Sequence, residues 1–434
     1  MEPAVIGLIG VIIFTVLVIL GVWVGFAAAT VGLVGLILFK GWGGAGGIAG
    51  FIPYSVTASF EFSVIPMFII MGYFAHYGGI TRNLFTAGRQ WFGHFPGGLA
   101  IATTFGAAGF GACSGSSTAA AAVLGKVAIP EMLRYNYDTK LAAGSVACAG
   151  TLAVMIPPSV NMVIYGVITQ QSIGSLLIGG IIPGVLQAIL LSITIYIWCK
   201  VKPTAGAALP RAPWRERFAS LKGIWGMLLM AITVIGGIYT GIFTPTEAGG
   251  IAAFVALLIA LGTRNLTWTN FKQALLDTGK ATAMIFITLI GILVLLRFLA
   301  LSGTIKLFVD VMLGLPLSPL GIMMVIIVIY LILGMFVSAT GMMMLTLPAI
   351  FPVILQLGYN PIWFGIMVTT LSEIAFITPP VAMNLYAVKA AAPDIPTVDI
   401  TKGILPFLIT FAIFLVLLVA FPQMAIWLPT TMRK

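Results

Sequence analysis

The chain has 434 residues, of which 60% are hydrophobic and only 7% are charged, and its mean hydropathy is +1.15. Because soluble domains carry about 25% charged residues, this composition excludes a soluble globular protein and predicts an all-α integral membrane protein. The formal net charge of +10 is expected to reflect a positive-inside bias of the loops and not nucleic-acid binding.

Long apolar stretches follow one another along the chain. A helix needs about 20 mostly apolar residues to cross a bilayer, and we interpret ten stretches as spans. No basic region precedes the first stretch, which is therefore predicted to be a span and not a cleaved signal peptide. The predicted spans cover residues 4–20, 24–40, 62–78, 139–167, 173–199, 223–242, 247–262, 281–300, 361–389 and 404–427.

Two further apolar stretches, 97–133 and 317–357, each contain polar residues near the middle. We expect both to be re-entrant hairpins, which enter the membrane, turn at mid-depth and leave on the same side. A short amphipathic segment precedes each hairpin, from Ile80 to Phe95 and from Thr304 to Leu315. These segments are predicted to lie along the membrane surface, and ordinary solvated connections are the alternative.

Prolines and hydroxyl residues of the first half recur in the second half at a constant spacing. This spacing is the one that separates Pro130 from Pro352. The same spacing relates Pro157 to Pro379, Pro158 to Pro380, Ser116 to Ser338 and Thr118 to Thr340. Such residues are costly inside apolar spans unless they have a role, and duplicated interrupted helices are typical of secondary transporters. We therefore predict a first repeat at 1–199, a linker at 200–222 and a second repeat at 223–434.

The distribution of basic residues predicts the topology. The linker at 200–222 is rich in Lys and Arg and is expected to be cytoplasmic. With five crossings in each half, the repeats are inverted relative to each other and both termini lie outside. Of the 21 Lys and Arg, 16 then lie inside and five outside, which supports this topology. The five are Lys40, Arg297, Lys306, Arg433 and Lys434.

Hydroxyl side chains and glycine interrupt each hairpin. The first tip reads Gly111-Ala112-Cys113-Ser114-Gly115-Ser116-Ser117-Thr118, and the second reads Val337-Ser338-Ala339-Thr340-Gly341. Glycine allows the backbone to turn, and serine or threonine can cap the helix that follows. Unwound backbone at this depth is tolerated only where it is buried in protein or lines a polar cavity. We therefore expect both tips to bind ligand, with close helix packing through small residues as the alternative.

Two predicted spans contain consecutive prolines, Pro157-Pro158 and Pro379-Pro380. Each pair removes two amide donors and forces the preceding residue out of helical geometry. The freed carbonyls, together with nearby hydroxyls, could supply the oxygen ligands that Na⁺ requires. A simple proline kink is the alternative at each break.

Two acidic residues have different interpretations. Glu247 follows Thr244 and Pro245 in a capping-box pattern, which predicts a structural role for all three residues. Glu373 lies inside a predicted span beside the second proline pair. An intramembrane carboxylate is a functional candidate, and Glu373 could ligate an ion, take a proton or pair with a cation.

These patterns give a set of predicted site residues. One predicted sodium site uses Ser114, Ser116, Gly150, Thr151 and the backbone near Ile156. The other uses Ser338, Thr340, Ser372, Glu373 and Thr378. Substrate contacts are predicted for Gly115, Ser117, Thr118, Pro157, Pro158, Ser159, Gly341, Pro379 and Pro380. The four interruptions contain no Lys or Arg, so helix N-termini, hydroxyls and Na⁺ would have to meet the charge of an anionic substrate.

Four strings carry a resemblance to a known family. GACSGSSTAAAAVLGKVAIPEM, GTLAVMIPPSVNMVIYG, GIYTGIFTPTEAG and ITPPVAMNLY resemble the large membrane subunit of tripartite ATP-independent periplasmic (TRAP) transporters. The similarity covers essentially the whole chain, and its motifs are specific and in the expected order.

The resemblance implies a Na⁺-driven importer of organic anions such as C4-dicarboxylates or sialic acids, located in the bacterial inner membrane. It implies two partners, a periplasmic substrate-binding protein and a small four-helix membrane subunit. That subunit is expected to be a separate polypeptide, since this chain has no surplus spans. The resemblance also implies an elevator mechanism, in which hairpins and broken helices move as one block, with membrane lipid around the protein and no organic cofactor.

Three alternatives belong to other classes. A stand-alone Na⁺/dicarboxylate symporter would share the hairpins but would not need a binding protein. A channel is disfavoured by the inverted broken helices. An intramembrane protease would need a base to activate Ser114, and the sequence places none, so the chain is not expected to be an enzyme.

Overall fold

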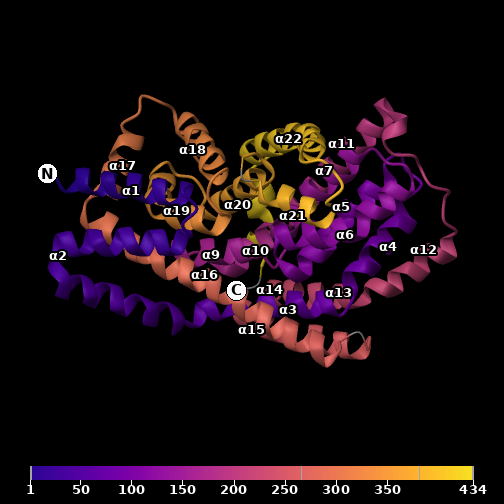
Figure 1. The fold of residues 1–434 in the computed structure, drawn as a ribbon, viewed down its shortest axis with the longest axis horizontal. Helices are drawn as coiled ribbons and strands as arrows, with labels where there is room; N and C mark the ends of the chain where they lie inside the picture. Colours follow the sequence, from indigo (N-terminus) through magenta and orange to yellow (C-terminus); the bar gives the residue numbers. More distant parts are fainter. Residues whose placement is uncertain (1, 265, 381, 433–434) are drawn as a thin grey trace.

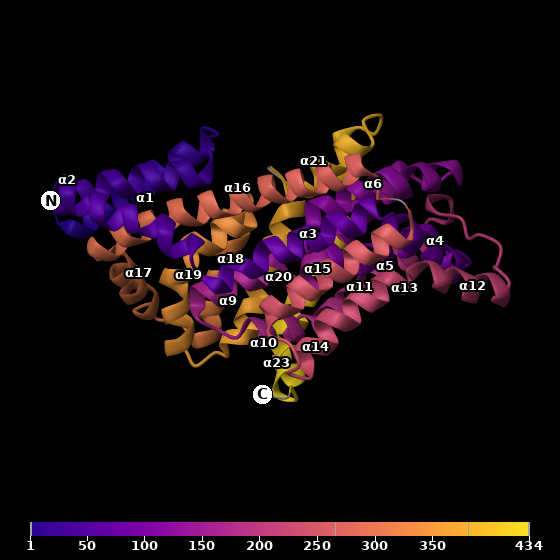
Figure 2. The same ribbon diagram turned by 90° about the horizontal axis from the view of Figure 1, so that it is seen from below.

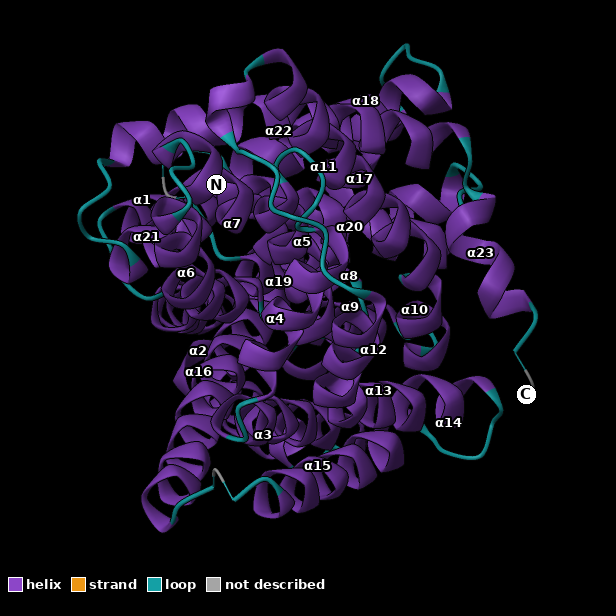
Figure 3. Ribbon diagram, turned by 90° about the vertical axis from the view of Figure 1, so that its right-hand side faces the viewer, coloured by secondary structure: helices purple, strands orange, loops and turns teal. Residues whose placement is uncertain are grey.

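A computed structural model of the chain describes residues 2–432 except 265 and 381, without the side chains of residues 80–82. The part of the chain that it describes contains helices and loops but no strand (Figure 3). The predicted all-α class is therefore confirmed. The predicted topology counted three cations that lie outside the described part of the structure. They are the side chain of Arg82, together with Arg433 and Lys434.

The first half of the chain forms eleven α-helices, including two that make a hairpin. In chain order they are α1 Pro3–Ile19, α2 Val24–Thr57, α3 Val64–Tyr77, α4 Ile80–Phe92, α5 Gly98–Ser114, α6 Ser117–Arg134, α7 Thr139–Gly150, α8 Leu152–Met155, α9 Val160–Thr169, α10 Ile173–Gly179 and α11 Ile181–Val201.

The linker contains one α-helix and a short 3₁₀ helix at Pro203–Ala205, and the second half contains the other α-helices. They are α12 Trp214–Leu221, α13 Trp225–Ala231, α14 Gly237–Tyr239, α15 Pro245–Gly262, α16 Trp268–Leu301, α17 Thr304–Leu313, α18 Pro319–Gly334, α19 Ala339–Gln356, α20 Pro361–Ile377, α21 Met383–Ala391, α22 Thr397–Ala420 and α23 Gln423–Thr430.

Two helical segments of each hairpin unit begin and end at corresponding positions. The second hairpin arms, α6 (Ser117–Arg134) and α19 (Ala339–Gln356), are offset by the repeat spacing of the sequence at both ends. The same offset relates the run Thr139–Met155, which contains α7 and α8, to α20 (Pro361–Ile377). The repeat spacing seen in the sequence is therefore also a spacing of helix boundaries.

The spans differ in part from the prediction. Among the described residues, eight helices are long and apolar enough to cross a membrane, or nine if the pair bent by 43° at the first proline break counts as one span. Ten spans were predicted, and two helices within them, α1 and α20, have only 17 residues each. One of the eight long helices, α19, was predicted as an arm of the second hairpin and not as a span. The orientation of the chain in the membrane stays a prediction.

Several predicted boundaries are wrong, and the span predicted at 281–300 begins earlier, at Trp268 of α16. The span predicted at 24–40 continues as α2 to Thr57, with a break in helical geometry at Gly41 (φ 67°, ψ 175°). A glycine tolerates that geometry, so the helix direction changes without a loop. The span predicted at 404–427 ends at Ala420, because Phe421 precedes Pro422 and leaves helical geometry (φ −126°, ψ 69°).

Helices from the two halves pack against each other along the molecule. The long helices α2 and α16 lie side by side in both views (Figures 1 and 2), and α3 packs along α15. A methyl group on Gly32 of α2 would lie 2.5 Å from the Leu295 amide nitrogen of α16. Small residues thus let the backbones approach closely, as is common between membrane helices.

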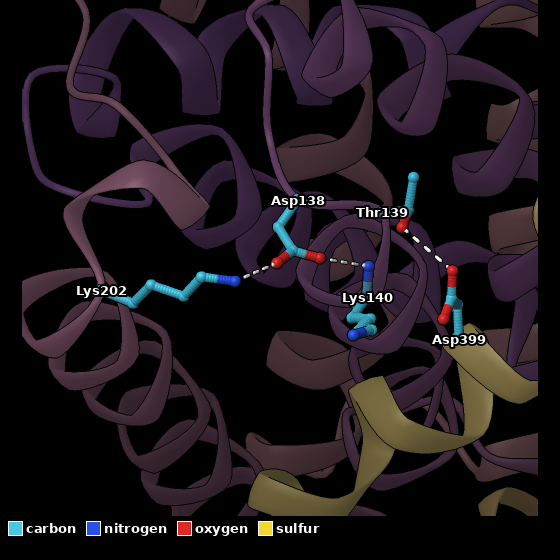
Figure 4. Close-up of polar contacts among 5 residues, drawn as sticks. All are labelled: Asp138, Thr139, Lys140, Lys202 and Asp399. Atoms are coloured by element: carbon cyan, nitrogen blue, oxygen red, sulfur yellow. Dashed lines mark hydrogen bonds and ion pairs between the residues drawn. The ribbon is translucent and has the colours of Figure 1, made fainter.

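The broken helix of the first half contacts the last long helix of the second half. Gly144 of α7 and Gly403 of α22 meet backbone to backbone, so a side chain at either position would collide with the other helix. At the start of α7 the Thr139 hydroxyl donates a hydrogen bond of 3.4 Å to Asp399 of α22 (Figure 4). These contacts fix the first broken helix against the second half.

Asp138 caps α7 and joins it to the linker (Figure 4). One carboxylate oxygen accepts from the Lys140 amide at 2.9 Å, and the other pairs with the Lys202 ammonium at 2.7 Å. Burial alone would raise the pKa of Asp138, but the hydrogen bonds from Lys202 and the Lys140 amide outweigh burial and hold that pKa below its usual value.

The predicted structural motif at α15 is confirmed. The Thr244 hydroxyl accepts from the Glu247 amide at 3.3 Å, and the Glu247 carboxylate accepts from the Thr244 amide at 2.9 Å. Pro245 occupies the first helical position. These three residues therefore form a complete capping box.

Candidate functional site

The first hairpin turns at the predicted tip. Helix α5 ends at Ser114, and Gly115 adopts the left-handed conformation (φ 59°) that favours glycine. The Ser116 hydroxyl then caps α6 by accepting from the Ala119 amide at 3.4 Å. A methyl group on Gly115 would lie 2.8 Å from the Pro158 carbonyl oxygen. The tip therefore lies directly against the first proline break.

The second hairpin also turns at its predicted tip, but through residues 335–338, none of which adopts the left-handed conformation. Helix α18 ends at Gly334 and α19 begins at Ala339, with Ser338 as its cap. The Ser338 hydroxyl accepts from the Gly341 amide at 3.3 Å. Gly334 packs so tightly on α20 that a methyl group there would collide with Ala375. Each hairpin therefore contacts the broken helix of its own half.

The two proline breaks have similar backbones but different surroundings. Ile156 (φ −88°, ψ 125°) and Thr378 (φ −97°, ψ 125°) are both extended, and a cis peptide bond joins each proline pair. Pro157 and Pro158 are buried, whereas Pro379 and Pro380 are exposed. The first break is thus enclosed by protein and the second is open.

A cavity of about 330 Å³ lies between the two tips. It brings together the predicted site residues Ser114, Gly115, Ser116, Ser117, Thr118, Ser338, Thr340 and Glu373. Among the described residues that line it there is no Lys or Arg. The cavity therefore combines hydroxyl groups from both hairpins with one carboxylate, between apolar side chains.

The remaining predicted residues do not line this cavity. They are Gly150, Thr151, Ile156, Pro157, Pro158, Ser159, Gly341, Ser372, Thr378, Pro379 and Pro380. Gly150 lies beside the hairpin, since a methyl group there would come within 2.9 Å of the Ser117 carbonyl oxygen. The Ser372 and Thr378 hydroxyls donate to the carbonyls of Thr369 and Ile374, both at 2.7 Å.

Thr151 is held by a residue that sequence reasoning missed. Its hydroxyl donates to the Cys148 carbonyl at 2.7 Å and accepts from the Gln187 amide at 2.9 Å. Gln187 lies on α11 and is 2% exposed, and its own amide oxygen has no hydrogen-bond partner. A glutamine inside an otherwise apolar span was the signal that could have identified it.

Glu373 is buried at the wall of the cavity with only 1% of its surface exposed. Its Oε1 accepts a hydrogen bond of 3.4 Å from the Asn161 amide on α9, and the Ser117 hydroxyl of the first hairpin tip lies beside the carboxyl group, whereas Oε2 has no partner at hydrogen-bonding distance. Asn161 was missed, although a polar residue just after the first proline pair was a visible signal. The contact joins the broken helices of the two halves.

Unsatisfied polar groups concentrate at this cavity. Besides Glu373 Oε2, the Ser114 hydroxyl and His76 Nδ1 are buried without a hydrogen-bond partner, and both residues line the cavity. Buried polar groups are normally paired, so these three atoms indicate a place where a ligand would complete the bonding. His76 was also missed, because its position relative to the hairpin depends on how α3 packs against α5.

The arrangement suits the binding of oxygen-rich ligands more than covalent chemistry. His76 and Ser114 share the cavity, but the Ser114 hydroxyl is bonded to no base within the described structure. The described residues contain no group of three or more His, Cys, Asp or Glu that could hold a metal ion. Hydroxyls and carbonyls are the ligands that remain for a hard cation.

A second, larger cavity of about 1010 Å³ lies elsewhere in the fold. Residues on its wall include Glu61, Gln170 and Asn360, and the only predicted site residues on it are the structural Thr244 and Pro245. The candidate site is therefore the smaller cavity between the hairpin tips.

Comparison with known proteins gives consistent matches. Residues 11–424 match the family "Tripartite ATP-independent periplasmic transporter, DctM component". The C4-dicarboxylate TRAP transporter large permease protein DctM of Pseudomonas aeruginosa is 36% identical, over 87% of this chain and 88% of that protein. The sialic acid TRAP transporter large permease protein SiaM of Vibrio cholerae is 34% identical, over 86% of each chain.

The fold is similar to a solved transporter structure. The YdaH transporter of Alcanivorax borkumensis matches with a TM-score of 0.61, over 87% of each chain and at 15% sequence identity. At this identity the match concerns the fold alone. The curated relatives are transport proteins and not enzymes.

Proposed function

Because the chain belongs to the DctM component family of tripartite ATP-independent periplasmic transporters, we propose that it is the large permease subunit of a Na⁺-coupled importer of organic acids. Substrate would come from a periplasmic binding protein, and a separate small four-helix membrane subunit would complete the complex. The protein would be a multi-pass component of the bacterial inner membrane with both termini in the periplasm. The relatives named for C4-dicarboxylates and sialic acid support carboxylate substrates.

One observation carries the proposal, namely the cavity lined by both hairpin tips. Helices α6 and α19 begin at this cavity. Helix N-termini carry partial positive charge and free amide donors, which favour carboxylates. Substrate would contact Gly115, Ser117 and Thr118 directly, while the proline pairs and Ser159 and Gly341 shape the surroundings.

We place Na⁺ at two sites close to the cavity. The first would use Ser114, Ser116, Gly150, Thr151 and a carbonyl near Ile156. The contacts of Gly115 with Pro158 and of Gly150 with Ser117 support this grouping. The second would use Ser338, Thr340, Ser372 and Thr378, with Glu373 nearby. Carbonyls at a broken helix together with hydroxyls are suitable Na⁺ ligands.

The transport step would follow an elevator mechanism. Two inverted repeats, 1–199 and 223–434, would each contribute a hairpin and a broken helix to one moving block. The close contacts between each hairpin and its own broken helix, at Gly111 with Ala153 and at Gly334 with Ala375, support movement of these elements together.

Uptake into proteoliposomes tests the proposal. The chain is reconstituted with its small subunit, and uptake of a ligand of its binding protein is measured with that protein present. We expect uptake that rises with an inward Na⁺ gradient and stops when K⁺ replaces Na⁺. Uptake that is indifferent to Na⁺ would contradict the coupling, and full uptake without the binding protein would indicate a stand-alone symporter.

A further inference from the structure

Glu373 presents a problem for a cavity that takes organic acids. It is the acidic residue among the described cavity residues, no Lys or Arg accompanies it, and its Oε2 has no hydrogen-bond partner. An unpaired buried carboxyl oxygen is unfavourable, and where Glu373 is ionised it would also repel a second carboxylate in the same enclosed space. A donor group on the ligand would relieve both costs, in addition to any Na⁺ bound at the proposed second site.

The helix ends around the cavity create two different electrostatic environments. Helices α6 and α19 direct their N-termini to it, which favours the acid group of a ligand. Glu373 lies in the last turns of α20, which ends at Ile377. The C-terminal end of a helix carries partial negative charge and favours hydrogen-bond donors or cations. A ligand with an acid group and a nearby donor group would match both.

We propose that Glu373 is a specificity-determining residue that accepts a hydrogen bond from a hydroxyl or ammonium group of the organic acid. Asn161 acts as a positioning residue, because its amide holds Oε1 at 3.4 Å and leaves Oε2 for the ligand. The substrate class is then hydroxy or amino acids in preference to plain carboxylates. This inference rests on the proposed function and deepens it by naming the substrate class.

Three acids with the same four-carbon skeleton provide matched probes. Succinate has no donor beside its carboxylates, L-malate has a hydroxyl, and L-aspartate has an ammonium group. D-Gluconate and hexanoate form a longer pair with and without hydroxyls. Each is titrated onto the purified complex of the chain with its small subunit, in Na⁺ and without the binding protein. Ligand-induced thermal stabilisation gives the dissociation constant.

For the wild-type complex we expect malate or aspartate to bind at least about 10-fold more tightly than succinate, because a hydrogen bond to a charged group is lost with succinate. Glu373→Met removes the acceptor and should bring the acids to near-equal affinity. Glu373→Gln keeps an uncharged acceptor and should retain a preference for malate while losing aspartate. The malate and aspartate results thus separate a hydroxyl from an ammonium partner.

Tyr330→Phe is the matched control, since Tyr330 is buried on α18, accepts from Thr346 at 2.8 Å and does not line the cavity. It should leave the ratio of affinities unchanged. If Glu373→Met fails to fold, Glu373→Gln still gives the comparison. Equal binding of succinate and malate by the wild type, or an unchanged preference in both Glu373 variants, would overturn the inference and leave Na⁺-dependent uptake intact. No stabilisation by any of the five acids would also overturn the inference, whereas the proposed function is tested separately by Na⁺-dependent uptake with the binding protein present.

Discussion

Thr151 and Glu373 occupy corresponding positions, one repeat spacing apart, in the broken helices of the two halves. The Thr151 hydroxyl is fully bonded, to the Cys148 carbonyl and the Gln187 amide. Glu373 is equally buried, yet one of its carboxylate oxygens has no partner. The two halves thus have corresponding helix positions here, but the side chain is held by protein groups in the first half and has an unpaired oxygen in the second.

The proline breaks show the same difference on a larger scale. The first break is buried and packs against Gly115 of its hairpin tip, whereas the second break is exposed. Two units with corresponding second hairpin arms and broken helices therefore sit in unlike environments within one conformation. The mechanism proposed above would need such a difference, because one side must be closed while the other is open.

Glycine at the first tip should give the largest effect in a comparison of the two tips. Gly115→Ala places a side chain in the left-handed region and within 2.8 Å of the Pro158 carbonyl oxygen. We expect a loss of about 3 kcal/mol in the free energy of unfolding, from backbone strain and overpacking. The apparent midpoint of thermal unfolding of the purified complex measures this loss.

Gly341→Ala is the matched control at the second tip. Gly341 is helical, and the nearest atoms to a new methyl group belong to the side chains of Ser338 and Val24, both at 3.1 Å. A change within about 1 kcal/mol is expected there. Equal losses at Gly115 and Gly341 would show that the two tips do not differ in backbone strain.

Substitution at the equivalent positions Thr151 and Glu373 should give the next largest difference. Thr151→Val removes the acceptor of the buried Gln187 amide, and we expect a cost of about 1–3 kcal/mol in unfolding free energy. Glu373→Gln replaces a buried carboxyl group that has one unpaired oxygen and should leave stability unchanged or increase it. Thermal unfolding without ligand compares the two variants.

The double variant Thr151→Val with Gln187→Met tests whether the stability lost in Thr151→Val comes from the unpaired Gln187 amide. It removes both polar partners and should recover much of the stability lost in Thr151→Val. If Glu373→Gln proves as costly as Thr151→Val, the free oxygen of Glu373 must be satisfied in the folded protein, and its assignment to a ligand would be wrong.

The caps of the two broken helices should give the smallest effect, and it should depend on pH. Asp138 caps α7 and Asn360 caps α20, and the two caps are again one repeat spacing apart. The pKa of Asp138 is lowered in the folded protein, so its contribution is present above the ordinary value of 3.8 and is lost as the pH falls through the lowered pKa. Asp138→Asn should therefore reduce stability slightly at pH 7 and not at all in strong acid.

The reduction is expected to be at most about 1 kcal/mol, because the Lys202 side chain is 55% exposed and such ion pairs are screened by water. Unfolding of wild type and variant across this pH range measures it. Asn360→Ala is the control, since its cap cannot titrate and its loss should be independent of pH. A pH-independent loss in Asp138→Asn would contradict the ion-pair contribution.

The hairpin arms and the breaks could be predicted from the sequence because local chemistry determines them. Ser116 and Ser338 cap the helices that follow, and the proline pairs end the helices before them. These signals act over a few residues and survive in any tertiary context. The continuation of α2 past residue 40 was missed because its glycines look like a loop, and only packing in the whole fold keeps that segment helical.

The candidate site could be predicted only in part, because some of its residues are brought together by contacts between distant parts of the sequence. The hydroxyls of both tips and Glu373 carry a local signal, and the structure places them on one cavity. Asn161, His76 and Gln187 act through contacts with residues far away in the sequence. Which partner each polar side chain would meet depends on helix packing, which no local pattern specifies.

The contact between Gly144 and Gly403 also has a consequence for biosynthesis. A ribosome adds about 5–20 residues each second, so α7 is complete well before α22 emerges. Until then, the face of α7 that carries Gly144 lacks the helix against which its backbone finally rests. The first half of the chain therefore cannot reach its final packing during its own synthesis, and maturation of the site waits for one of the last membrane helices to be made.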